Sequence, residues 1–254
     1  MKTENSNSGR GANRPRRSAA RQDHFHGILL VDKPAGITSH DVVARIRHEF
    51  NFKKVGHGGT LDPMATGLLV ILLGRKGTRL SQWVMGGDKV YEGVMHLGIA
   101  TNTQDIEGRV LAEKDPSEIT REQLENQISK WRGDIQQIPP MVSALKKNGM
   151  PLYKLARKDQ EIEREPRLRH VYFFKLLEFD SPFARFRLKC TKGTYVRTLC
   201  ADIGESLGCG AHLRELNRTE SGSFKLENAH ALEDILRMNL AELEKIVLPT
   251  SVAG

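Results

Sequence analysis

Residues 57–73 read HGGTLDPMATGLLVILL, and this stretch is the most informative part of the chain. It places one carboxylate, Asp62, before a proline in a loop of small residues, and it ends in an apolar run that predicts a buried strand. Three glycines free the backbone while Pro63 fixes one φ angle, which suits a loop that aims a side chain at a ligand. Asp before Pro is also common turn chemistry, so Asp62 is either a turn former or a reactive group.

The composition indicates one sizeable globular domain with an insertion or a small appendage. The chain has 254 residues, of which 39% are hydrophobic and 28% charged. No apolar stretch approaches the ~20 residues of a membrane span, and the N-terminus lacks the apolar core of a signal peptide. The three cysteines suit a reducing compartment, so we expect a cytoplasmic protein. We also expect a monomer without membrane contact. Cys209 and His212 have CxxH spacing but no second ligand pair, so no metal site is expected.

The net charge of +8 is distributed unevenly. Residues 1–26 carry six basic and two acidic side chains, which is half of the excess. Because this segment is rich in Ser, Asn, Gly and Arg and poor in apolar residues, we expect residues 1–25 to form a disordered basic arm. Such an arm binds polyanions without sequence preference, or it only solubilises the chain.

Apolar periodicity predicts a mixture of strands and helices. Strands are expected over 27–34, 68–73, 90–97, 109–111, 171–179 and 183–190. Helices are expected after a cap at Thr38 or Ser39, near 78–84, over 119–131 capped by Thr120, over 196–207 capped by Thr194, and near 232–247. These elements follow no strict βαβ rhythm, so the predicted class is α+β with a mixed, mostly antiparallel central sheet flanked by helices.

Two further features concern function. Residues 138–166 form a long irregular region rich in Lys and Arg, and such loops are usually functional or mobile. The run Gly74-Arg75-Lys76-Gly77-Thr78 lacks the spacing of a phosphate-binding loop, and no GxGxxG motif follows a strand. Polar candidates remain near predicted strand ends, at Asp62, Tyr91, Tyr195 and Arg197, but spacing alone does not bring them together.

The segment His57–Leu69 resembles the central motif of the tRNA pseudouridine synthases of the TruB type. Four more stretches agree in order and spacing, at residues 27–39, 88–108, 137–157 and 192–213. The likeness covers about residues 26–220 and implies a pseudouridine synthase catalytic domain, with 138–166 as an RNA-clamping insertion. Residues 221–254 are then a short helical extension, and we expect no PUA-type RNA-binding domain.

The resemblance implies that the protein converts uridine to pseudouridine in the T loop of tRNA, at position 55. It implies Asp62 as the catalytic nucleophile, Arg197 as its charge partner and Tyr91 as the platform on which the uracil stacks. It implies further substrate-site residues, which are His57 as the wedge in the T loop, Tyr195, Leu216, and Lys33 in a motif that buttresses the loop. An isomerisation requires no cofactor, metal or ATP, and attack at C1′, C2′ or C6 stays open.

Other functions are compatible with parts of the sequence. A non-catalytic chaperone that folds tRNA would use the same basic surfaces. A glycosidase would require two cooperating acids, and the sequence offers no credible second one. Within the resembling family, the loop at 101–108 and the dense insertion motif favour a stand-alone tRNA enzyme over the guide-RNA-dependent relatives of the dyskerin type.

Overall fold

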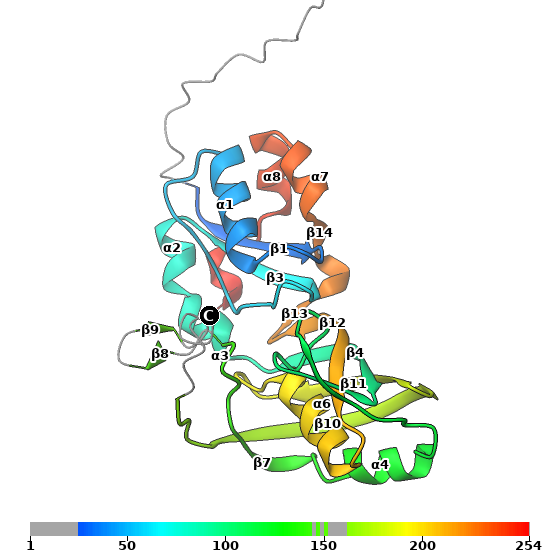
Figure 1. Ribbon diagram of the computed structural model, residues 1–254. Helices are drawn as coiled ribbons and strands as arrows, with labels where there is room; N and C mark the ends of the chain where they lie inside the picture. The colour runs from blue at the N-terminus through cyan, green and yellow to red at the C-terminus, as the bar shows by residue number, and fades with distance from the viewer. Residues whose placement is uncertain (1–24, 144–145, 148–149, 152–161, 254) are drawn as a thin grey trace, which may run out of the picture.

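The computed structural model describes residues 25–143, 146–147, 150–151 and 162–253 (Figure 1). The basic arm expected over 1–25 lies outside these residues apart from Phe25. The same is true of residues 144–145, 148–149 and 152–161 within the expected insertion.

A ten-stranded sheet runs through the described part of the molecule. Its order is β14-β1-β3-β12-β4-β11-β10-β7, with β13 on β12 and β2 on β3. The strands are β1 Gly27–Lys33, β2 Val55–His57, β3 Thr66–Leu73, β4 Lys89–Leu97, β7 Gly133–Gln137, β10 Arg167–Asp180, β11 Phe183–Cys190, β12 Ala211–Ser221, β13 Phe224–Lys225 and β14 His230–Ala231. Among these strands β1–β14 and β3–β12 pair in parallel and the other neighbours antiparallel, which confirms the predicted sheet. Separate hairpins join β5 Ile99–Thr101 to β6 Val110–Glu113 and β8 Lys146–Lys147 to β9 Met150–Pro151.

Short helices flank this sheet. They are α1 Ser39–Glu49, α2 Gly74–Arg79, α3 Ser81–Gly86, α4 Arg121–Ser129, α6 Val196–Ser206, α7 Leu232–Arg237 and α8 Leu240–Ile246, with 3-10 turns η1 Leu226–Asn228 and η2 Thr250–Ala253. Figure 1 shows α1, α7 and α8 at one end of the molecule and α4 and α6 at the other. Thr38 and Thr120 form capping boxes with Asp41 and Gln123, which confirms the predicted cap at Thr120 and decides between Thr38 and Ser39 in favour of Thr38.

Several predicted elements were wrong in detail. The helix near 78–84 is the pair α2 and α3, and the helix near 232–247 breaks between Arg237 and Leu240. The second break occurs because Met238 is extended and the Asn239 side chain caps α8. Tyr195, not Thr194, occupies the N-cap of α6. The polar strand β7 and the short β5 were not predicted.

Strand β3 anchors the loop that precedes it. Its alternate residues Leu69, Ile71 and Leu73 belong to the main core, while Leu68, Val70 and Leu72 face a smaller cluster on the other side of the sheet. Covering on both faces explains why this strand is a continuous apolar run. No helix of the described residues is both long and apolar enough to cross a membrane.

Candidate active site

Hydrogen bonds to the backbone on both sides of Asp62 hold the loop between β2 and β3 in place. The Ser39 hydroxyl, at the start of α1, accepts a bond from Leu61 N (2.9 Å) and donates one to Leu61 O (3.2 Å). On the other side of Asp62, Pro63 O accepts from Gly36 N (2.8 Å) and from the Lys33 ammonium (3.2 Å). The residues on both sides of Asp62 are therefore fixed, which orients its side chain.

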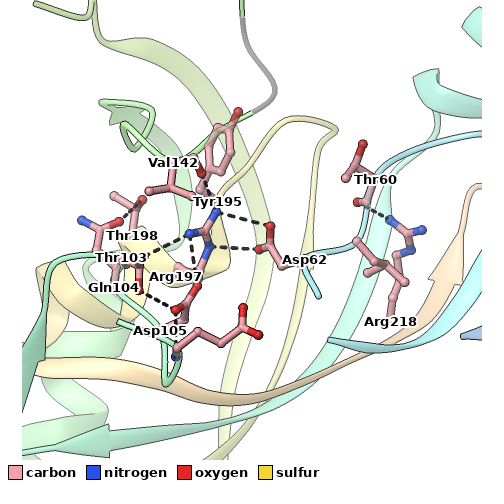
Figure 2. A network of polar contacts seen from close by, with 12 residues as sticks. Thr60, Asp62, Thr103, Gln104, Asp105, Val142, Tyr195, Arg197, Thr198 and Arg218 are labelled. Carbon is pink, nitrogen blue, oxygen red and sulfur yellow. Dashed lines mark hydrogen bonds and ion pairs between the residues drawn. The ribbon is translucent and has the colours of Figure 1, made fainter. Parts of the chain in front are cut away.

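Asp62 forms a turn and also an ion pair. Ala65 N donates to Asp62 O at 3.1 Å, so the backbone does make the turn that Asp-Pro suggests. The carboxylate points elsewhere, to Arg197 at the start of α6, with 2.9 Å between Oδ2 and Nε and 3.4 Å between Oδ1 and Nη2 (Figure 2). The pair joins residues 135 positions apart. Its Asp62 side chain remains 34% exposed, whereas that of Arg197 is 3% exposed.

Four hydrogen bonds hold the Arg197 guanidinium in addition to the ion pair through Nε. Nη2 donates to Asp62 Oδ1 and to Val142 O (2.9 Å), and Nη1 donates to Thr103 O (3.0 Å) and to the Asp105 carboxylate (3.2 Å). Both Nη atoms of the guanidinium therefore use their two N–H donors, out of the five that the group carries. Because it is buried and held by these bonds, Arg197 fixes the position of Asp62.

The pKa of Asp62 is subject to opposing effects. Partial burial of the carboxyl raises the pKa of Asp62 above its usual range, and the positive charge of Arg197 opposes the rise. The negative charge of Asp105 adds to the rise. A carboxylate that is paired, reachable and raised in pKa is suited to covalent or proton-transfer chemistry.

Tyr91 lies on β4 and is 8% exposed. Burial raises the pKa of Tyr91 to about 12, and the nearby Arg218 charge partly offsets this rise. The Asp62 charge also raises this pKa, which relates Tyr91 electrostatically to the carboxylate. The phenol is therefore neutral near pH 7, which favours a stacking role over that of a phenolate base.

The other expected substrate-site residues differ in exposure. His57 ends β2, half-buried, and burial lowers its pKa, so the ring is neutral near pH 7. Tyr195 precedes Arg197, and Gln137 holds both its N–H (2.8 Å) and its carbonyl (3.0 Å). Leu216 on β12 is 8% exposed. Lys33 is fully buried, and its ammonium donates to the carbonyls of Pro34, Ile37 and Pro63, so it lies behind the loop.

Two charged residues near Asp62 were not identified from the sequence as site residues. Asp105 is buried in the loop at 101–108, where the hydroxyl of Thr103 and the N–H of Glu107 also donate to its carboxylate. Arg218 on β12 is 1% exposed and donates to carbonyls of the Asp62 loop. Asp105 lies within the stretch 88–108 that resembles the family, but it was not singled out there, and Arg218 lies outside the stretches that carry the resemblance. The described residues contain no group of three or more His, Cys, Asp or Glu that could hold a metal ion.

Family models match almost the whole described chain. Residues 47–196 match the model of the TruB family pseudouridylate synthase N-terminal domain, and residues 197–253 match that of the tRNA pseudouridylate synthase B C-terminal domain. The boundary falls at the start of α6, yet the sheet continues across it because β12 pairs with β3 and β4.

Curated relatives and solved structures agree with these models. A tRNA pseudouridine synthase B of Opitutus terrae is 51% identical, covering 90% of this chain and 94% of that protein. Another from Stutzerimonas stutzeri is 49% identical, covering 84% of this chain and 69% of that protein. A chain in the crystal structure of a Cbf5-Nop10-Gar1 complex is 33% identical with a TM-score of 0.70, covering 89% of this chain and 61% of that one.

Proposed function

The chain belongs to the TruB family of pseudouridylate synthases, and on that basis we propose that it converts a uridine in the T loop of tRNA, at position 55, to pseudouridine. The names of its relatives support tRNA as the substrate. The observation that carries the proposal is the partly exposed Asp62 carboxylate, which is held by the buried Arg197 guanidinium. The reacting group is thus reachable and oriented before substrate arrives.

The reaction breaks the N1–C1′ bond of uridine, turns the uracil and joins C5 to C1′. The proton lost from C5 is balanced by the proton gained at N1, so no oxidant or other co-reactant is consumed. Asp62 acts as the nucleophile in its ionised form, and Arg197 favours that form by opposite charge. Positioning of this kind accounts for a large part of enzymatic rate enhancement.

The uridine must leave the stacked loop before it reaches Asp62. Extruding a base costs a few kcal/mol, which stacking on the Tyr91 ring offsets by about 1–3 kcal/mol. His57, neutral near pH 7, fills the vacated space in the RNA. Tyr195 and Leu216 line the uridine site, and Lys33 supports the loop from behind.

We assign the catalytic domain to residues 26–220 and the RNA clamp to the insertion at 138–166. Support for the clamp comes from its base, where Val142 O binds Arg197 and so ties the insertion to the catalytic pair. The basic arm at 1–25 adds non-specific affinity for tRNA, and its deletion is expected to flatten the salt dependence of binding.

The test uses an unmodified tRNA transcript and chemical mapping of pseudouridine. Wild-type protein is expected to modify the T-loop uridine, and Asp62→Asn is expected to give no product while still binding the transcript. The matched control is Asp202→Asn, which removes an aspartate from the same helix as Arg197 without touching the site. Full activity of Asp62→Asn would refute the role of Asp62. Binding without modification by the wild type would favour an RNA chaperone.

A further inference from the structure

A second buried arginine, Arg218, donates hydrogen bonds to both ends of the Asp62 loop. Arg218 Nη2 donates to Gly59 O (3.1 Å) and Nη1 to Thr60 O (3.3 Å), on the chain entering the Asp62 turn. Its Nε donates to Leu68 O (2.8 Å), on the chain leaving it (Figure 2 shows the bond to Thr60). One planar group therefore joins both ends of the loop.

Arg218 also neighbours Tyr91, the other candidate catalytic residue, in the sheet. Arg218 lies directly opposite Tyr91 in the antiparallel pairing of β12 and β4, and its charge partly offsets the raised pKa of Tyr91, while Asp62 is two residues from a carbonyl that Arg218 holds. Asp62 and Tyr91 come from different elements, the β2–β3 loop and β4. Arg218 is a single rigid group between them.

Close backbone contact keeps Arg218 at this place. Gly67 of β3 pairs with Arg218 of β12 where the two strands run parallel. A Cβ on Gly67, whose φ is +93°, would lie 2.5 Å from Arg218 O and 2.9 Å from Arg218 N. Only glycine permits this approach, which brings the guanidinium up to the loop carbonyls.

Backbone carbonyls, and no carboxylate of the described residues, stabilise the charge of Arg218. Arg218 is 1% exposed, and among the described residues no carboxylate lies within ion-pair distance of its guanidinium. Its hydrogen-bond partners are the backbone carbonyls of Gly59, Thr60 and Leu68. An unpaired buried charge is costly, so the guanidinium is stabilised only while the loop keeps this shape. Opening the loop would leave the charge without acceptors.

We propose that Arg218 is a positioning residue for pseudouridine formation, which holds the Asp62 loop and Tyr91 in their reactive arrangement without contacting the RNA. This inference rests on the proposed function. A lysine keeps the charge but presents one point donor where the arginine fork spans two segments. The reaction rate should therefore depend on the fork itself, while affinity for tRNA should not.

The test compares Arg218→Lys and Arg218→Met with Lys89→Met. Lys89 is a matched control because its ammonium is also buried (5% exposed) and bound to carbonyls, but these belong to Val84, Met85 and Gly87 outside the loop. Single-turnover rate, affinity for a tRNA transcript and amide hydrogen exchange over residues 58–68 are measured for each folded variant.

Arg218→Lys is expected to lower the single-turnover rate about 100-fold and to change affinity less than about twofold. Amide exchange over residues 58–68 should rise at least about tenfold. Lys89→Met should keep its rate within about threefold of wild type and keep exchange over 58–68 unchanged. Wild-type-like exchange and rate in Arg218→Lys, or an equal rate loss in Lys89→Met, would overturn the proposal. If wild type forms no pseudouridine, the proposed function fails, while amide exchange still decides whether Arg218 holds the loop.

Discussion

Two buried arginines contact the Asp62 loop, Arg197 from helix α6 and Arg218 from strand β12, and they use different partners. Arg197 binds two carboxylates, of Asp62 and Asp105, together with two carbonyls. Arg218 binds three carbonyls and lies opposite Tyr91 in the sheet. The first arrangement sets the charge of the reacting group and the second sets the shape of the loop that carries it. Substitutions at the two places should therefore fail in different ways.

The largest effect is expected for Arg197→Lys. The lysine ammonium cannot contact all four partners of Arg197 together. The ion pairs with Asp62 and Asp105 are therefore weakened. We expect the single-turnover rate to fall about 1,000-fold, since losing one preorganised charge typically costs this much. Quench-flow or manual quench assays on a labelled transcript would measure it. A loss below about tenfold would show that Asp62 needs no fork-shaped partner.

A smaller loss of rate is expected for Asp105→Asn, together with a shift of the rate profile to lower pH. The Asp105 charge raises the pKa of Asp62, so its removal should lower that pKa and move the acidic limb of the rate profile to lower pH. Arg197 also loses one anchor, so the plateau rate should fall about tenfold. The rate profile between about pH 4 and 8 would measure both quantities. A shift toward higher pH would contradict this coupling.

The smallest effect is expected for Ser39→Ala. It removes the acceptor of Leu61 N next to Asp62, and an unsatisfied buried N–H costs about 1–2 kcal/mol of unfolding free energy. Arg218 and Lys33 still hold the loop, so the rate should change less than about fivefold. Denaturant unfolding is the measurement, with the exposed Ser129→Ala as its control, expected within about 0.5 kcal/mol of wild type. Equal losses in both variants would show that Ser39 does not support the loop.

The sequence predicted the parts of the fold that depend on apolar pattern and caps. Strand β11 was predicted at its observed bounds, Thr120 was predicted as a cap, and Thr38 was one of the two caps expected for α1. The polar strand β7 was missed because its sequence GDIQQ has few residues with strand propensity and it lies at the edge of the sheet. The break at Asn239 was missed because apolar residues continue at helical spacing across it.

Less of the site than of the fold could be predicted from sequence patterns. Asp62 and Arg197 are 135 residues apart, so their pairing followed from resemblance to a family and not from spacing. Arg218 binds backbone carbonyls, which any residue provides, so its partners leave no pattern in the sequence. Side-chain pairs can produce recognisable motifs, whereas side-chain contacts to backbone become visible only in three dimensions.

The most direct measurement compares the pH dependence of the single-turnover rate for Arg197→Lys and Arg218→Lys. Arg197→Lys weakens the pairing that opposes the raised pKa of Asp62, so that pKa should rise further. Because the ionised carboxylate is the reactive form, the acidic limb should move to higher pH by about half a unit or more. Arg218→Lys should lower the plateau and leave the midpoint in place. An unshifted limb in Arg197→Lys, or the same shift in both variants, would contradict the division between charge and shape.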